Sequence, residues 1–547
     1  MSASSKKKLR NEQQSAKLTE RQIAEQKEAR KLKAYTISFV AVIAVLLVVA
    51  ICVGVGQLVS NSGIREKNTT ALTVGSHNIS NAELSYYYID SINKFYSSNG
   101  SYASFFGLDV SQPLDAQVMD ESTGETWADY FLSSAEDSVR SVYAINDAAA
   151  EAGYTLTEED QSSLDSIMSS LSLYAGLYGY NDTDTYLKAM YGKGASEKSY
   201  RSYVEMSLIA DSYYNAYSEA LTYEDADLRA AEAENFNAYS AFTYNTYYLS
   251  ASKFLEGGTT NEDGTTTYSD EEKAASVAAA KEAAESLTSE EITTVEELDA
   301  AIAALSINAD AETKPSSTLY EDTNYSSVSS TFRDWVSDTS RKAGDKTYIE
   351  SSSTSTDDEG NETTTVSGYY VIYFQGMNDN NFPMKSVRHI LVQFEGGTTD
   401  DNGTTTYSDE EKAAAEAEAN EILTEWKNGE ATEDSFAALA NERSDDGDGT
   451  TGGLYENIVP TSNYVENFLN WALAAHKPGD TGVIETEFGF HVMYFVGDSQ
   501  QTYRDYMIEN NLRSADVSAW SNGLVDAMTM EEKDTSYINK SLVMSAS

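Results

Sequence analysis

The stretch that decides the organisation of this chain occurs twice. Residues 256–275 read EGGTTNEDGTTTYSDEEKAA, and residues 395–414 read EGGTTDDNGTTTYSDEEKAA. The correspondence resumes downstream, where RKAGDKTYIE at 341–350 matches HKPGDTGVIE at 476–485 and GYYVIYF at 368–374 matches GFHVMYF at 489–495. A repeat with a period of well over a hundred residues indicates a duplicated domain, not a solenoid.

The two copies differ in their histidines. The second copy has His389 and His491 near its two ends, whereas the first has Tyr370 opposite His491 and no histidine in its span. This difference predicts that the second copy carries the chemistry and the first serves as scaffold.

Length and charge limit the classes of protein that fit. A chain of 547 residues is too long for one core, so three or four domains are expected. The net charge is −51, but residues 1–33 hold ten Lys/Arg against four Asp/Glu, a net of +6, and the rest sums to −57. Such a field repels nucleic acid and favours basic or unfolded polypeptide partners. Cys52 is the only cysteine, so no intramolecular disulfide forms.

Residues 34–59 contain no charged side chain, and 26 such residues suffice for a transmembrane helix. The basic tail at 1–33 then stays in the cytoplasm, and residues 60–547 lie outside the membrane as the bulk of the protein. A cleaved signal peptide fits poorly, because the segment is long and lacks a clean small-residue site. A lipoprotein anchor at Cys52 also fits poorly, because Ile51 precedes it.

The pattern after the linker predicts a mainly helical domain at residues 70–235. It opens as strand, glycine turn, strand and helix, with Ser80 as N-cap and Glu83 completing a capping box. Tyrosines and leucines then recur at helical spacing, as at residues 171–178. They indicate either a packed core or an aromatic groove for non-native chains. Residues 501–547 form a further helical segment.

Each repeat reads as strand, acidic insert, Ala/Glu-rich helix, irregular middle, short helix and two strands, so the fold class is α+β. The insert Gly396–Ser408 is rich in glycine, threonine and aspartate, which predicts a solvated loop. Its acidic residues lack the EF-hand spacing and terminal glutamate, so no metal site is predicted.

Five segments of the second copy, residues 382–497, follow in order and at consistent spacing. They are Val387–Val392 with its histidine, Phe436–Ala440 followed by Ser444–Asp446, the turn Gly452–Leu454, the turn Lys477–Asp480, and the closing strand Phe488–Val492. Together they resemble the parvulin family of peptidyl-prolyl isomerases. The resemblance implies a four-stranded antiparallel sheet surrounded by helices.

By position, the resemblance makes His389 and His491 the paired core histidines and Asp446 the polar residue at the active-site rim. The histidine pair is as much structural as catalytic in this fold. The implied substrate-binding residues are Leu454, Tyr464, Phe468, Thr486 and Phe488. The spacing between Leu454 and Trp471 departs from the family pattern. His77 and His476 match no such pattern and are predicted to be structural or surface residues.

Rotation about an X-Pro bond breaks no covalent bond, so neither a nucleophile nor a cofactor is expected. The amide barrier is roughly 18–20 kcal/mol, and uncatalysed X-Pro isomerisation takes tens of seconds or more. A pocket that lowers the barrier by about 4–7 kcal/mol accelerates the reaction roughly 10³–10⁵-fold.

The region from Val74 to Tyr87 is similar to the opening of the PrsA- and SurA-like extracytoplasmic foldases. The resemblance implies a helical chaperone domain to which residues 501–547 return. It also implies a membrane-anchored isomerase and chaperone for exported, partly folded polypeptides, with no nucleic-acid partner. The alternative is a holdase whose parvulin domains only bind peptides.

The first copy, residues 238–376, is expected to be a degenerate parvulin-like domain without isomerase activity. Phe332 and Trp335 echo Phe468 and Trp471, which supports a common fold. A tyrosine at position 370 does not replace an imidazole that both donates and accepts hydrogen bonds.

Overall fold

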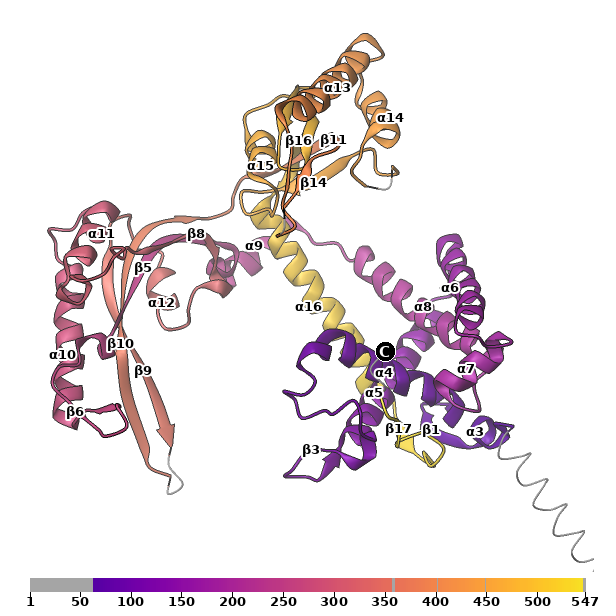
Figure 1. Cartoon of the computed structure of the whole chain (residues 1–547). Helices are drawn as coiled ribbons and strands as arrows, with labels where there is room; N and C mark the ends of the chain where they lie inside the picture. The colour runs from indigo at the N-terminus through magenta and orange to yellow at the C-terminus, as the bar shows by residue number, and fades with distance from the viewer. Residues whose placement is uncertain (1–61, 357–359, 401, 448, 545–547) are drawn as a thin grey trace, which may run out of the picture. The chain divides into compact units, whose positions relative to one another are not determined.

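The computed structural model describes residues 62–356, 360–400, 402–447 and 449–544 (Figure 1). The chain divides into two compact units, one of them continuous from Thr222 to Ser514 and the other formed by the residues before and after it. The predicted cytoplasmic tail at 1–33 and membrane segment at 34–59 lie outside the described residues. Within the described ranges, no helix is long and apolar enough to cross a membrane.

The first unit combines a small antiparallel sheet, in the order β17-β1-β2, with a set of helices. Its helices are α3 (Ile64–Asn68), α4 (Asn81–Asn99), α5 (Trp127–Glu151), α6 (Glu158–Leu177), α7 (Thr183–Tyr191) and α8 (Glu197–Ala220). Its strands are β1 (Thr70–Val74), β2 (His77–Ser80), β3 (Val118–Asp120), β4 (Glu125–Thr126) and β17 (Met530–Glu532). The long helix α16 (Tyr503–Ala527) contributes its C-terminal half to this unit.

The start of α4 corrects the predicted capping box. Ser80 is the N-cap and accepts a hydrogen bond from the Glu83 amide at 3.2 Å. The Glu83 carboxylate does not return to the Ser80 amide but accepts a hydrogen bond from the Tyr143 hydroxyl on α5. Burial against α5 gives this carboxylate a different donor, and burial also raises its pKa.

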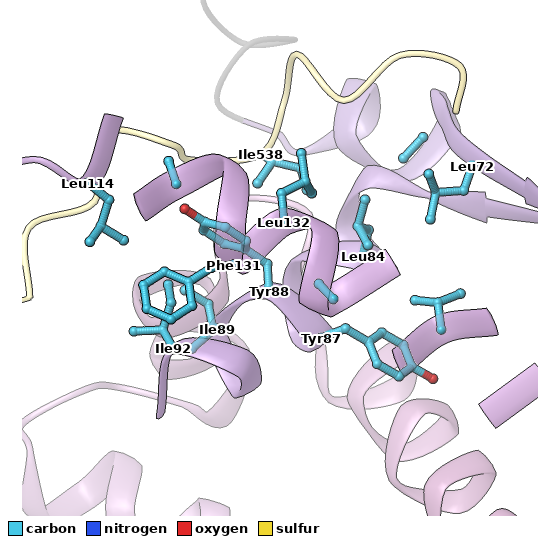
Figure 2. Packing of buried hydrophobic residues seen from close by; sticks show 14 of the residues in the cluster. Leu72, Leu84, Tyr87, Tyr88, Ile89, Ile92, Leu114, Phe131, Leu132 and Ile538 are labelled. Atoms are coloured by element: carbon cyan, nitrogen blue, oxygen red, sulfur yellow. The ribbon is translucent and has the colours of Figure 1, made fainter. Parts of the chain in front are cut away.

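The core of the first unit draws on both ends of the chain. Leu84 and Tyr88 of α4 pack with Phe131 and Leu132 of α5, and Ile538 from the C-terminal segment joins the same cluster (Figure 2). The C-terminal segment also supplies β17, which pairs antiparallel with β1. The sequence predicted only helix in 501–547, because a three-residue strand is too short to show a period.

The second unit contains two four-stranded antiparallel sheets with equivalent strand orders, β8-β5-β10-β9 and β14-β11-β16-β15. The first repeat has strands β5 (Ala241–Ser250), β8 (Thr318–Asn324), β9 (Lys346–Thr356) and β10 (Glu362–Asn378), and helices α10 (Asp270–Leu287), α11 (Val295–Ala304) and α12 (Arg333–Val336). The second repeat has strands β11 (Pro383–Gln393), β14 (Leu454–Ile458), β15 (Thr481–Glu485) and β16 (Gly489–Thr502), and helices α13 (Asp409–Asn428), α14 (Glu433–Arg443) and α15 (Glu466–Leu473). Helix α9 (Asp225–Glu234) precedes them.

Both faces of each sheet are buried, because successive residues of its central strands point to opposite faces. In the second repeat, Ile390 and Val492 pack against α13 and α14, while Val387 and Met493 pack against α15 on the other face. In the first repeat, one face of the sheet packs against α10 and α11, and the other face packs against the short helix α12.

The inserts form small hairpins on the surface of each repeat, β6 (Thr259–Thr260) with β7 (Thr266–Thr267) and β12 (Thr398–Thr399) with β13 (Thr405–Thr406). Their threonines are exposed. In both hairpins one glutamate of the following helix, Glu272 or Glu411, accepts from the backbone at the base of the insert and from the N-cap serine.

Candidate active site

The two histidines of the second repeat meet inside its sheet. His389 on β11 and His491 on β16 point to the same face, because His491 lies opposite Leu391, two residues from His389. Their Nδ1 atoms are 2.9 Å apart, and both side chains are buried. Phe468 of α15 covers both rings, at 5.3 Å from His389 and 5.7 Å from His491.

Asp446 reaches His389 because the segment after α14 runs along β11. The Asp445 amide donates to the Leu391 carbonyl at 2.8 Å, and the Leu391 amide donates to Ser444 Oγ at 3.1 Å. These bonds place Asp446 Oδ2 3.0 Å from His389 Nε2.

A pair of glycines brings the last wall of the site into place. Gly453 has φ of 64°, and its carbonyl accepts from the His389 amide at 2.9 Å. A Cβ at Gly453 would lie 2.1 Å from the His389 carbonyl oxygen, so only glycine allows this approach. The next strand, β14, then carries Tyr455, whose hydroxyl donates to Asp446 Oδ2 at 2.7 Å.

The buried polar atoms form one continuous chain. Thr486 Oγ1 lies 2.9 Å from His491 Nε2, and from there the chain continues through the two Nδ1 atoms to His389 and Asp446. An ionised carboxylate only accepts hydrogen bonds, so His389 donates to Asp446 through Nε2. With both imidazoles neutral, His491 then donates through Nδ1 and accepts from the Thr486 hydroxyl. In this neutral state every proton of the hydrogen-bonded series points toward Asp446.

The electrostatics agree with this order. Burial lowers the pKa of His491 to about 4, which keeps its ring neutral near neutral pH. The hydrogen bond from His389, followed by that from Tyr455, holds the pKa of Asp446 well below its usual range. Burial, and then the hydrogen bond to Asp446, raises the pKa of Tyr455 to about 12.

A cavity of about 530 Å³ opens beside this chain. It is lined by His389, Leu391, Gln393, Asp446, Tyr455, Asn463, Tyr464, Val465, Phe468, Phe488 and His491. Aromatic side chains thus share the wall with the two histidines and Asp446. Phe488 is 56% exposed, so it stands at the mouth.

Of the residues implied by the sequence, the structure brings together His389, Asp446, His491, Tyr464, Phe468 and Phe488 at this cavity. Thr486 lies behind His491 and does not line the cavity. Leu454 also does not line it, and its neighbour Tyr455 takes that place, since adjacent residues of a strand face opposite sides. Within the described ranges, no cluster of three or more His, Cys, Asp or Glu side chains is arranged to hold a metal ion.

His77 and His476 lie outside the cavity. His77 contacts Asp147 at 2.9 Å in the first unit. His476 stacks on Trp471 at 4.2 Å and contacts the Trp471 carbonyl, after α15 has ended at Leu473.

Residues 369–498 match the family model of the PPIC-type PPIase domain. The match begins in β10 of the first repeat and covers the whole predicted segment 382–497. This segment is therefore a parvulin-type peptidyl-prolyl isomerase domain.

The chain also overlaps several solved structures at low identity. The peptidylprolyl isomerase PrsA from Bacillus anthracis is 19% identical over 27% of this chain and 59% of that one, with a TM-score of 0.16. A SurA-like chaperone structure from Campylobacter jejuni is 23% identical over 28% of this chain and 59% of that one, with a TM-score of 0.15. PrsA from Bacillus subtilis is 14% identical over 76% of this chain and 93% of that one, with a TM-score of 0.25.

The chain thus spans less than two thirds of the first of these structures. No curated protein matches the chain.

Proposed function

We propose that the protein is a peptidyl-prolyl cis/trans isomerase and chaperone that assists the folding of exported proteins outside the cytoplasmic membrane. The observation that carries the proposal is the cavity where His389, His491 and Asp446 meet an aromatic wall, inside the segment that matches the PPIC-type domain.

The cavity supplies what X-Pro rotation requires. The aromatic side chains, above all Phe468 and Tyr464, offer an apolar surface of the right kind for a prolyl ring. Excluding water from the amide disfavours its charge-separated planar form and favours the twisted state, in which resonance is lost. His389, Asp446 and His491 line the same cavity, where they can contact the rotating carbonyl. No cofactor is part of this scheme.

A protease-coupled assay with short proline peptides tests the isomerase on the full chain. We expect acceleration well above buffer, and a large loss in the Phe468→Ala variant, which removes the ring that covers both histidines. A folded protein whose rate equals that of buffer would refute the catalytic part of the proposal.

A second candidate function is a holdase whose parvulin domain only binds peptides. Large apolar side chains near the end of α6 favour it, because Leu173 is 63%, Leu177 71% and Tyr178 70% exposed. Exposed apolar groups close together mark interaction surfaces. Phe468→Ala separates the two functions: a holdase loses isomerisation but still suppresses aggregation of an unfolded client. Loss of both activities together would remove the basis of this candidate.

For the cellular setting, we propose a single membrane span at 34–59 with the basic tail at 1–33 in the cytoplasm. The parts outside are the helical chaperone domain at 70–235, the degenerate repeat at 238–376, the isomerase domain at 382–497 and the returning segment at 501–547. The partners are partly folded polypeptides with X-Pro bonds. Added protease should digest the ectodomain on cells stripped of their wall, and full protection of the chain would exclude this orientation.

A further inference from the structure

Tyr455 occupies an unusual place beside the histidine pair. Its hydroxyl donates to the same carboxylate oxygen, Asp446 Oδ2, that accepts the proton of His389 Nε2. Its ring meets the His389 imidazole edge-on at 4.8 Å. Tyr455 therefore contacts both members of the pair His389–Asp446 and also faces the cavity.

The backbone of Asp446 is held by the bonds of Ser444 and Asp445 to β11, and its amide donates to Ser444 Oγ at 3.2 Å. These contacts do not themselves fix the rotamer of its side chain. Asp446 follows α14 in a segment rich in serine, aspartate and glycine, where Gly447 and Gly449 have φ of 81° and 72°, and its side chain is 38% exposed. A half-exposed carboxylate in such a loop samples several rotamers unless a second contact selects one. Tyr455 provides that contact from a strand, where the pairing of Tyr455 with Val387 of β11 fixes its backbone.

We propose that Tyr455 is a positioning residue of the isomerase site: it holds Asp446 in the rotamer that accepts the His389 proton. This inference rests on the proposed function and adds a residue that acts through Asp446. Fixing Asp446 in turn fixes the order of protons in the chain that ends at Thr486. The titratable groups that face Asp446 are His389 on β11, His491 on β16 and Tyr455 itself, with Asp445 adjacent in sequence.

The first repeat offers a matched control at the same place in the sheet. Tyr320 pairs with Tyr244 on β5 as Tyr455 pairs with Val387 on β11. The Tyr320 ring stacks on Tyr244 at 5.1 Å, and a carboxylate does not appear among its contacts in the described structure. Tyr320→Phe thus removes a hydroxyl at the equivalent position without touching the isomerase site.

The test compares Tyr455→Phe, Tyr455→Ala and Tyr320→Phe in the full chain, with kcat and KM measured separately for each. In Tyr455→Phe the ring remains, so KM should stay unchanged while kcat falls roughly threefold to tenfold. Asp446 loses one of its two donors, so its pKa rises toward the ordinary value of an aspartate. Tyr455→Ala should also raise KM, and Tyr320→Phe should match the parent protein.

A second readout does not depend on turnover. The chain has only four histidines, so ¹⁵N-histidine labelling gives four resolvable ring systems. We expect His389 as the Nε2–H tautomer in the parent and a mixture of tautomers in Tyr455→Phe, with the His77 and His476 signals unchanged. A Tyr455→Phe variant with parental kcat and parental tautomers would overturn the inference. Absence of isomerisation in the parent would refute the proposed function instead, and the tautomer measurement would still decide the role of Tyr455.

Discussion

The two repeats correspond position by position in their strand registers, yet they differ at both histidines and at the threonine of the hydrogen-bonded chain. Gly368 faces Ser250 as Gly489 faces Gln393, so Thr246 takes the place of His389 and Tyr370 that of His491. Ile349 faces Tyr370 as Ile484 faces His491, which puts Ser351 in the place of Thr486. The sheet therefore does not require the polar chain.

The replaced positions show how the first repeat fills the space. The Tyr370 ring packs against Phe332 at 5.4 Å and Tyr248 at 4.7 Å, so a phenol occupies the region of the histidine pair. Thr246 Oγ1 is buried, and it finds no hydrogen-bond partner among the described residues. A chain of hydrogen bonds needs all its members at once, and loss of one leaves the others unpaired. What the repeats share is packing and turn geometry: the Gly344 amide donates to the Phe374 carbonyl as the Gly479 amide donates to the Phe495 carbonyl, each at 2.9 Å.

The largest effect is expected when the residues at positions 491 and 370 are each replaced by their counterpart in the other repeat. His491→Tyr should lower kcat/KM by roughly 10²-fold or more, because a phenol cannot accept from Thr486 and donate to His389 in the imidazole geometry. Tyr370→His should leave the first repeat inactive, since Thr246 is no partner for a histidine. Isomerase assays on both variants and on the parent decide this. An active His491→Tyr protein would show that the histidine pair is dispensable.

The equivalent phenylalanines separate stability from activity. Phe332 and Phe468 are both buried, at 4% and 3% exposure, and each anchors a short helix under its sheet. Replacing either by alanine should cost about 3–5 kcal/mol of unfolding free energy in its own repeat. Only Phe468→Ala should reduce isomerisation, by an expected tenfold or more. Denaturant unfolding and the peptide assay measure both effects, and an activity loss from Phe332→Ala would contradict the division of labour.

The repeat explains which features were predictable. Turns, glycines and the alternation of apolar residues recur in both copies. Residues such as Phe468 and Gly479 therefore predict the short helix and the two strands that follow it. His389, Asp446 and His491 could be predicted from the sequence because the motifs that contain them follow one another in the family's order. The role of Tyr455 could not be predicted, because it depends on which face of a five-residue strand the side chain occupies. The two glycines before β14 decide which of its residues point toward the cavity, and no local pattern shows this. The Glu83–Tyr143 contact and β17 also depend on tertiary pairing that no local pattern records.

Acid should unfold the second repeat before the first. The pKa of His491 is lowered from 6.5 to about 4 in the folded state, so the unfolded chain binds this proton at higher pH than the native chain does. The contribution of neutral His491 to the free energy of unfolding is fully present above pH 6.5. It is lost as the pH drops from 6.5 toward 4, by on the order of 3 kcal/mol. Asp446 adds a further loss below the ordinary aspartate pKa, because its folded pKa is also lowered. The first repeat, residues 238–376, contains no histidine that could lose stability in this way. Hydrogen exchange of β16 and β10, corrected for intrinsic rates, compares the repeats, and equal slopes would contradict the prediction.

The smallest effect concerns the part in which the repeats are most alike. Glu411 accepts from the Gly397 amide at 2.9 Å and from the Ser408 amide at 2.7 Å, and Glu272 makes the same two contacts with Gly258 and Ser269 at 2.8 and 2.7 Å. These bonds lower the pKa of both carboxyls, the backbone bond from Gly397 or Gly258 being the largest cause. Glu411→Gln and Glu272→Gln keep one acceptor oxygen but lose the charge, so each should lower the Tm of its repeat by only about 1–3 °C. The two losses should be equal and should leave kcat/KM unchanged, because both inserts lie away from the cavity. Calorimetry on the two variants measures the Tm shifts. A drop in isomerisation confined to Glu411→Gln would instead couple the insert of the second repeat to its site, and the near-identity of the two inserts would then need a functional reason as well as a structural one.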